Sequence, residues 1–346
     1  MVYIPSVLVA LLLPSILAGC RDLTVGGDTL GYMEPTFRIA LSCDSFATLC
    51  DRSRLEPLYL LLSYGIAQCT DDVAWFLFFQ HLIIILIVYL SVYRWRNRVP
   101  TYFCMLIFFC LSYCWALNIV RQMLALSFCL LSFSYLLKYQ MLRSLFVFLP
   151  ALGFHATSFI YLIIYPIFYI VNNKNTRIIR IGEIVGLSVF FLIILNIENL
   201  LTLLISIDLL PEHFMIYSLS TGLEATDFPS GRFFYCLFMF ALLWYIRRKN
   251  YNKDMFILFE CLILSCLALC FLSLFIGATV SRCVWYFLFL SIIFLPMMLY
   301  NKRKRCISYN LNYVCVIFLL FYWFGSVVLN KFTAALPYTS ELLDIN

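Results

Sequence analysis

Three polar residues that could do chemistry, Asn118, Arg121 and Gln122, stand at the start of a long apolar stretch, NIVRQMLALS at 118–127. An arginine is costly in lipid and usually faces a polar cavity and a partner. Its planar guanidinium forms bidentate hydrogen bonds with phosphate. The stretch therefore predicts a site for an anionic, lipid-linked ligand at the end of a membrane helix.

Four further side chains are expected at the same membrane depth. Arg282 begins an apolar stretch, Arg232 precedes another, His155 sits at the apex of a short apolar hairpin, and Glu56 opens the short segment LEPLYLLL. A neutral imidazole can serve as a general base, although a histidine in an apolar hairpin can equally be a packed, hydrogen-bonded residue. Arg232 can also be an interfacial side chain that snorkels to water.

The acidic pair Asp71-Asp72 has two interpretations. It could hold a metal or deprotonate an acceptor in an outer loop, or it could mark a solvated turn or a helix N-cap. The 15 cysteines show no metal-ligand spacing, and most lie in apolar segments, where they behave as small hydrophobic residues. Cys43 and Cys50 could form a disulfide if their loop faces an oxidising space. We expect no metal site.

The elements that position these residues are membrane helices. The chain has 346 residues, of which 64% are hydrophobic and 12% charged, against about 25% charged in soluble domains. We expect an all-α, polytopic membrane protein in which residues 1–346 form one domain of 9–12 helical segments. Nine full spans are predicted, near residues 2–20, 73–93, 99–117, 119–137, 178–198, 233–246, 255–276, 283–300 and 311–330.

Basic residues predict the orientation. Five clusters hold 16 of the 24 lysines and arginines, and cytoplasmic loops are rich in these residues. The clusters are Arg94/Arg96/Arg98, Lys138/Arg143, Lys174/Arg177/Arg180, Arg247/Arg248/Lys249/Lys253 and Lys302/Arg303/Lys304/Arg305. If all five are cytoplasmic, the N-terminus lies inside and the C-terminus outside. Short clusters between apolar spans also argue against nucleic acid as a partner.

Two segments are too short for the crossings that they would need, because one crossing takes about 20 residues. Residues 144–171 lie between basic clusters, so we expect a short helical or re-entrant hairpin, loosened by Pro150 and Gly153. Residues 55–70 are expected to form a half-inserted or interfacial helix. The remaining polar segments, 21–56 and about 199–232, are predicted to be the large outer loops.

Six motifs follow one another along nearly the whole chain. They are GGDTLGY at 26–32, LEPLYLLL at 55–62, NIVRQMLA at 118–125, FHATSFIYL at 154–162, RCVWYF at 282–287 and LPYTSEL at 336–342. In this order they resemble the EpsG family of exopolysaccharide and O-antigen polymerases, which are of the Wzy type.

The resemblance implies a glycosyltransferase of the bacterial inner membrane that joins repeat units carried on undecaprenyl pyrophosphate, at the periplasmic face. It implies no cofactor and no metal, and it adds as partners a chain-length regulator and a flippase of the same pathway. His155 would be the base, and Arg121 and Arg282 would neutralise the leaving pyrophosphate. The expected substrate-binding residues are Asn118, Gln122, Arg232, Asp28, Tyr32 and Glu56.

Two rival functions use similar residues. A transferase that adds one sugar from a lipid-phosphate donor would rely on Asp71-Asp72 or Asp28 and a metal. A flippase of the lipid-linked unit would need no chemistry, but such proteins tend to show repeat-related halves with matching broken helices, and this sequence shows neither.

Overall fold

The computed structural model is almost entirely helical. It describes residues 4–172, 228–248, 253–276, 278–301, 306–307, 309–331 and 333–345, together with residues 202 and 206. The chain divides into two compact units, one made of residues 1–158 and 302–346 and the other of residues 159–301. Two strands of two residues each, β1 (Tyr300–Asn301) and β2 (Cys306–Ile307), interrupt the helical pattern.

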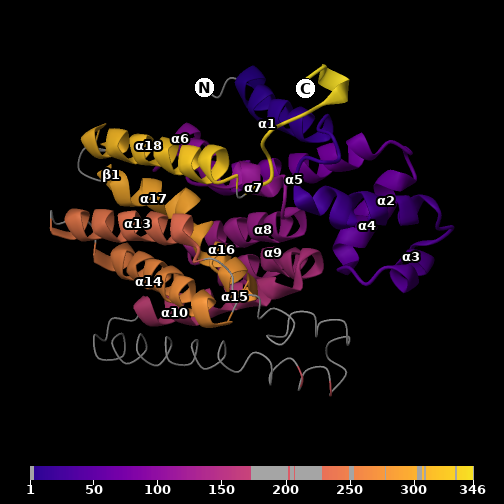
Figure 1. Ribbon diagram of the computed structural model, residues 1–346. Helices are drawn as coiled ribbons and strands as arrows, with labels where there is room; N and C mark the ends of the chain where they lie inside the picture. The colour runs from indigo at the N-terminus through magenta and orange to yellow at the C-terminus, as the bar shows by residue number, and fades with distance from the viewer. Residues whose placement is uncertain are drawn as a thin grey trace. The chain divides into compact units, whose positions relative to one another are not determined.

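The first unit contains the helices of the N-terminal part of the chain, α1 to α9, and the C-terminal helix α18 (Figure 1). Its elements are α1 (Ile4–Gly19), the π-helical turn η1 (Thr29–Met33), α2 (Glu34–Leu41), α3 (Phe46–Arg52), α4 (Pro57–Ala67), α5 (Val73–Tyr93), α6 (Thr101–Phe108), the π-helical turn η2 (Phe109–Tyr113), α7 (Cys114–Ala116), α8 (Val120–Leu136) and α9 (Met141–Phe154). The C-terminal part adds α18 (Tyr309–Trp323), the π-helical turn η6 (Phe324–Leu329) and the 3₁₀ turn η7 (Glu341–Leu343).

Small polar contacts and apolar packing hold α8 at the centre of this unit. Helix α8 packs against α5 and α9, and α5 also packs against α1. The hydroxyls of Ser132 on α8 and Ser144 on α9 lie 2.9 Å apart, which lets the two backbones approach closely. The rings of Phe128 and Phe154 stack at the other end of the same helix pair.

The acidic pair before α5 has a structural role. The Asp72 carboxylate accepts a hydrogen bond from the backbone N–H of Ala74 at 2.9 Å, so Asp72 is the N-cap of α5. The N-cap interpretation of this pair is therefore confirmed. Cys43 and Cys50 are both free thiols, so the structure contains no disulfide between them.

The second unit is described by itself. Its helices are α10 (Ile164–Val171), α13 (Ser230–Arg248), α14 (Lys253–Ile276), α15 (Ala278–Cys283), α16 (Trp285–Leu288) and α17 (Ser291–Leu299), and the 3₁₀ segment η3 (Ala156–Ile163) leads into it. Helix α14 packs against α13, α15 and α10. The hydroxyls of Tyr235 on α13 and Ser291 on α17 lie 2.9 Å apart in its interior.

The nine predicted spans are confirmed only in part. Three helical stretches are long and apolar enough to cross a bilayer, Val73–Tyr93, Phe256–Leu274 and Asn310–Leu329. The bent pair Val280–Leu288 and Ser291–Leu299 makes a fourth if its two halves form one span. Several other predicted spans are shorter apolar helices, among them Pro5–Gly19 and Val120–Leu136, and the span predicted at 178–198 lies outside the described residues.

The two segments that the sequence predicts to be too short to span, 144–171 and 55–70, form short helices. Helix α9 ends at Phe154, and η3 and α10 follow directly after His155. Helix α4 has only 11 residues, too few to cross a bilayer. The predicted outer loop 21–56 is instead largely helical, because α2 and α3 pack on α4 around Ala40, Leu49 and Leu60. Most of the other predicted outer loop, 199–232, lies outside the described residues.

Candidate functional site

A break between α7 and α8 forms the base of the candidate site. The chain leaves helical conformation at Asn118 and Ile119, and the Asn118 carboxamide oxygen accepts a hydrogen bond from the backbone N–H of Asp28 at 3.2 Å. Gly26 adopts a φ of 84° in the same loop, and a Cβ there would lie 2.2 Å from the Leu117 carbonyl oxygen. The glycine-rich loop GGDTLGY therefore lies directly on the start of α8, which only glycine permits at position 26.

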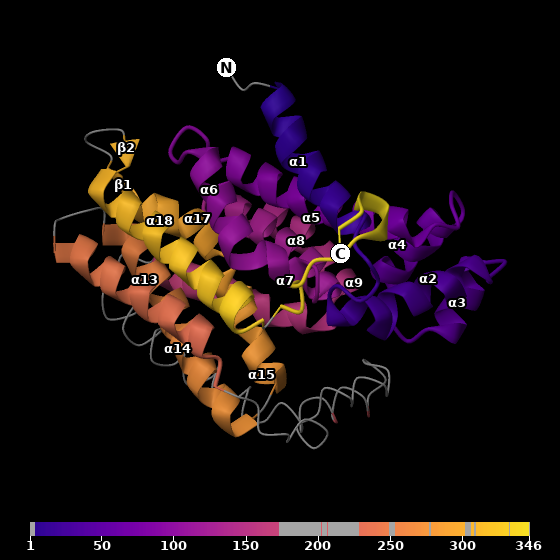
Figure 2. The same cartoon turned by 45° about the horizontal axis from the view of Figure 1, so that its top comes forward.

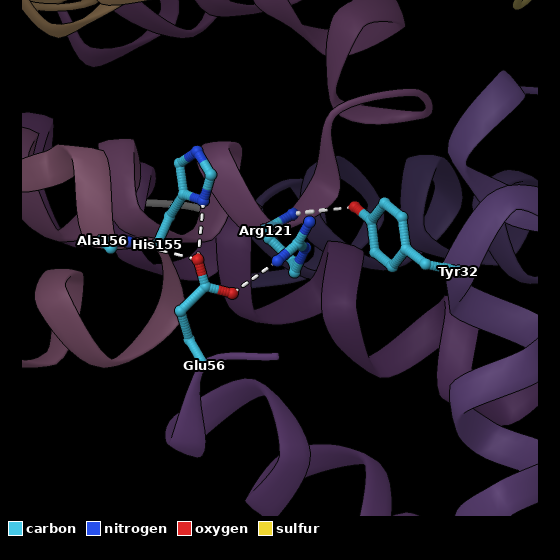
Figure 3. Close-up of polar contacts among 5 residues, drawn as sticks. All are labelled: Tyr32, Glu56, Arg121, His155 and Ala156. Carbon is cyan, nitrogen blue, oxygen red and sulfur yellow. Dashed lines mark hydrogen bonds and ion pairs between the residues drawn. The ribbon is translucent and has the colours of Figure 1, made fainter. Parts of the chain in front are cut away.

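The Glu56 carboxylate connects two of the predicted catalytic side chains (Figure 3). Its Oε2 lies 2.5 Å from Nη1 of Arg121, and its Oε1 lies 3.0 Å from Nδ1 of His155. The backbone N–H of Ala156 also donates to Oε1, at 3.2 Å. Glu56 is the N-cap of α4, Arg121 lies in the first turn of α8, and His155 is the C-cap of α9, so three helix ends meet at this carboxylate.

The electrostatics fix the proton positions. Burial alone would raise the pKa of Glu56, but the hydrogen bond from His155 and the charge of Arg121 outweigh burial and lower this pKa to about 2. An ionised carboxylate only accepts hydrogen bonds, so Nδ1 of His155 must donate to it. The other ring nitrogen, Nε2, points away from Glu56 (Figure 3), and it is the nitrogen that can take up a proton whenever the ring is neutral.

Tyr32 on η1 covers Arg121 from the other side. The Arg121 guanidinium carbon lies 4.4 Å from the centre of the Tyr32 ring, within cation–π range. The Tyr32 hydroxyl accepts a long hydrogen bond, of 3.5 Å, from the backbone N–H of Arg121. Burial, and then the charge of Asp28, raise the pKa of Tyr32, so its phenol is protonated at neutral pH. Arg121 is thus held between a carboxylate and an aromatic face, with 17% of its side chain exposed.

The structure joins six of the nine predicted site residues in two groups of contacts. Tyr32, Arg121, Glu56 and His155 form one group, and Asp28 and Asn118 form the other. Gln122 is buried beside Arg121 on α8. The remaining two lie in the second unit: Arg232 donates to the carbonyl and the hydroxyl of Ser281, and Arg282 is exposed on α15.

Two buried polar residues next to η1 are not among the predicted site residues, Arg21 and His81. The Nη1 atom of Arg21 lies 3.3 Å from Nε2 of His81, and both side chains are buried. Arg21 looks like an ordinary interfacial arginine because it follows a span directly. The available signal was the pair Gln80-His81 within an otherwise apolar span, since buried polar side chains in a membrane helix need partners.

The described residues contain no group of three or more histidine, cysteine, aspartate or glutamate side chains placed to hold a metal ion. The polar groups that do meet are a carboxylate, an imidazole and a guanidinium. Together they can orient an imidazole for proton transfer and place a cation beside it.

The fold and the site define an almost entirely helical membrane protein in which a buried carboxylate contacts a histidine and an arginine. The chain belongs to the EpsG family, whose model matches residues 5–340, nearly the whole sequence. No curated protein and no solved structure matches the chain. The predicted family is therefore confirmed, and it places the protein with membrane proteins of exopolysaccharide polymerisation.

Proposed function

We propose that this protein polymerises undecaprenyl-pyrophosphate-linked oligosaccharide repeat units into surface polysaccharide. The product would be O-antigen, capsule or exopolysaccharide, made at the periplasmic face of the bacterial inner membrane. The observation that carries the proposal is the contact of Glu56 with both His155 and Arg121, in a chain of the EpsG family.

His155 acts as the general base in this proposal. Its Nε2 takes the proton from a hydroxyl at the non-reducing end of the incoming repeat unit, and that oxygen attacks the anomeric carbon of the growing chain. Glu56 holds the ring in the tautomer that leaves Nε2 basic, and it stabilises the imidazolium that forms. Carboxylate–histidine pairs have the same roles in other transferases and hydrolases.

Arginines stabilise the leaving group. When the new glycosidic bond forms, the bond from the anomeric carbon to the pyrophosphate oxygen breaks, and undecaprenyl pyrophosphate leaves with the electron pair. A guanidinium has five N–H donors and can bind a carboxylate and a phosphate oxygen at once, so the Glu56 contact is compatible with this role for Arg121. We assign pyrophosphate binding also to Arg282 and Arg232.

Sugar binding falls to the groups around Arg121. We assign it to Asp28 and Tyr32 on the glycine-rich loop, and to Asn118 and Gln122 at the start of α8. An aromatic ring beside a cation provides both a stacking surface and a fixed charge.

The proposed orientation places the N-terminus in the cytoplasm and the C-terminus outside. Within the first unit, Lys138 donates to the backbone oxygen of Arg94 at 2.6 Å, so two of the basic clusters lie at one end of this unit. That is the arrangement expected if both clusters face the cytoplasm. The chain-length regulator and flippase of the pathway are the proposed protein partners.

A gene deletion in the native host tests the function. Surface polysaccharide is separated by size, and the deletion strain is complemented with wild type, His155→Ala and Arg282→Ala, with membrane levels checked by immunoblot. We expect complete single repeat units without a ladder, a ladder restored by wild type, and no ladder with either variant present at wild-type levels.

Two other outcomes would contradict the proposal. Repeat units that lack one sugar would identify a single-sugar transferase. Complete units that accumulate on their carrier at the cytoplasmic face would identify a flippase, and the assignments of His155 and the arginines would then lose their chemical meaning.

A further inference from the structure

Arg21 is a buried arginine outside the proposed chemistry, and its contacts converge on one short turn. The residue lies two positions after the end of α1, and its side chain is almost fully buried, since the residue is 4% exposed. Its Nη2 donates to the Thr29 hydroxyl at 3.1 Å and reaches the Met33 sulfur at 3.7 Å. Its Nη1 lies 3.3 Å from Nε2 of His81 on α5.

These partners are all uncharged acceptors. Among the described residues, Arg21 forms no ion pair with a carboxylate, and its Nε has no hydrogen-bond partner. Burial lowers the pKa of Arg21 to about 10, so the guanidinium is still charged at neutral pH. A buried charge that lacks a paired carboxylate costs free energy, so Arg21 contributes little to stability through its charge. What an apolar side chain could not replace is the planar guanidinium, whose N–H donors have fixed directions.

The Arg21 guanidinium contacts both ends of η1. Thr29 is the first residue of this turn and Met33 is the last. Tyr32 lies between them, and its ring covers Arg121 at 4.4 Å. The Thr29 hydroxyl also donates to the Val25 carbonyl at 2.9 Å, which connects η1 to the loop before it. Tyr32 therefore lies in a turn, η1, whose first and last residues both contact the Arg21 guanidinium.

The histidine completes the connection to α5. Nδ1 of His81 lies 2.8 Å from the Leu77 carbonyl oxygen, to which it donates in the tautomer that carries its proton on Nδ1. Nε2 lies 3.3 Å from Nη1 of Arg21 and 3.1 Å from the Ala116 carbonyl oxygen, so it accepts from Arg21 in the Nδ1-protonated tautomer and donates to Ala116 in the other. In the Nδ1-protonated tautomer the hydrogen bond runs from Arg21 to His81. Arg21 then joins η1 to the middle of a long helix instead of to another loop.

The C-terminal tail lies beside the end of α1 (Figure 2), and its hydrogen bonds fix the backbone on either side of Arg21. The backbone N–H of Asp22 donates to the Thr339 carbonyl at 3.0 Å, and the Asp22 carboxylate accepts from the backbone N–H of Glu341 at 2.9 Å. The Ser340 hydroxyl donates to the Cys20 carbonyl. The C-terminal tail thus holds the backbone around Arg21, while the Arg21 guanidinium contacts η1.

We propose that Arg21 is a positioning residue, which orders η1 and so places Tyr32 over Arg121. Its catalytic consequence rests on the proposed polymerase function, but its effect on η1 does not. No direct contact of Arg21 with substrate is required.

The test measures order and activity separately. Purified protein in lipid nanodiscs is compared as wild type, Arg21→Met and Arg38→Met, using hydrogen–deuterium exchange of the peptides that cover residues 25–37. Arg38 is the matched control, because it lies on the adjacent helix α2 with 60% of its side chain exposed, paired only locally with Glu34. We expect the η1 amides of Arg21→Met to exchange about tenfold faster, and those of Arg38→Met to stay near wild type.

Activity is then measured in a double-mutant cycle. If Arg21 acts through Tyr32, Arg21→Met should reduce polymer formation about tenfold alone and add little to the loss caused by Tyr32→Ala. Should Arg21→Met fail to fold, Thr29→Val removes the Thr29 hydroxyl with its hydrogen bonds to Arg21 and to the Val25 carbonyl, and it is expected to loosen η1 in the same way.

Two results would overturn the proposal: unchanged exchange at η1, or losses from Arg21→Met and Tyr32→Ala that multiply. If wild type makes no polymer at all, the proposed function fails. The exchange measurement still decides whether Arg21 orders η1, so the two failures are distinguishable.

Discussion

The two ends of the first unit use their cations in different ways. At one end, which we call the basic end, the turns at 94–99 and 137–140 meet. There the Arg94 guanidinium lies 3.4 Å from the centre of the Tyr135 ring, and the Lys138 ammonium lies 5.3 Å from the Trp95 ring. Where the structure describes the chain, Arg94, Arg96, Arg98 and Lys138 form no ion pair with a carboxylate.

The other end, the site end, contains the buried Glu56 with Arg121 and His155. Only 5% of the Glu56 side chain is exposed. Aromatic rings and backbone oxygens suffice to anchor long cationic side chains at a membrane surface. A buried carboxylate costs desolvation and is weak evidence for stability. The difference fits the roles proposed above, orientation in the membrane for the basic end and chemistry for the site end.

Removal of Arg121 is expected to have the largest effect. Arg121→Ala leaves the Glu56 carboxylate buried beside His155 without its cation, and breaking a buried pair costs about 3 kcal/mol or more. It also removes the proposed pyrophosphate ligand, so we expect at least a ~100-fold loss of polymer formation. The measurement is the rate of chain extension by purified protein, with thermal unfolding measured in parallel. Activity near wild type would exclude Arg121 from the site.

The next effect comes from the loop that lies on α8. Gly26→Ala places a Cβ within 2.2 Å of a backbone carbonyl, in a φ region that disfavours alanine. We expect a destabilisation of about 3 kcal/mol, seen as a lower unfolding midpoint. Gly31→Ala is the control, since a Cβ at Gly31 meets nothing within 4 Å. Equal behaviour of the two variants would contradict the close packing at the site end.

Acidity should separate Glu56 from an ordinary glutamate. Its pKa is lowered to about 2 in the folded protein, from 4.5, so Glu56 contributes stability that is fully present above pH 4.5 and is lost as the pH falls towards 2. The difference in unfolding midpoint between wild type and Glu56→Gln should therefore be constant from pH 7 to about 4.5 and shrink below it. A difference that disappears already at pH 6 would contradict the charged pair.

The smallest effect is expected at the basic end. Arg94→Ala removes one cation–π contact and one hydrogen bond to Gln140, worth about 1 kcal/mol together. Polymer formation should stay within about twofold of wild type, because no part of the proposed chemistry lies there. A large loss of activity with normal membrane insertion would remove the distinction between the two ends.

Much of this organisation could be predicted from sequence because membrane helices leave strong local signals. The bounds of α5 match the predicted span at 73–93, and α8 lies within the one predicted at 119–137. The break at His155 was predicted from Pro150, Gly153 and the length of the segment between two basic clusters. The family followed from six motifs in order.

The contacts of the site could not be predicted from sequence in the same way. Glu56 lies 65 residues from Arg121 and 99 residues from His155, and only tertiary packing of three helix ends brings them together. Arg21 escaped notice because its partners are neutral and distant in sequence. The helices within 21–56 were missed because they are short, and their apolar faces pack on each other instead of forming one long run.

The most direct test of the site compares two glutamates that both pair with arginine. Glu56→Gln and Glu34→Gln each remove one carboxylate charge, from a buried pair of 2.5 Å and from an exposed pair of 2.8 Å, respectively. The measurement is the rate of polymer extension by purified protein on the lipid-linked repeat unit. We predict a loss on the order of 100-fold for Glu56→Gln and none for Glu34→Gln, because only Glu56 orients a general base. Equal rates for the two variants would contradict a catalytic role for the Glu56–His155 pair.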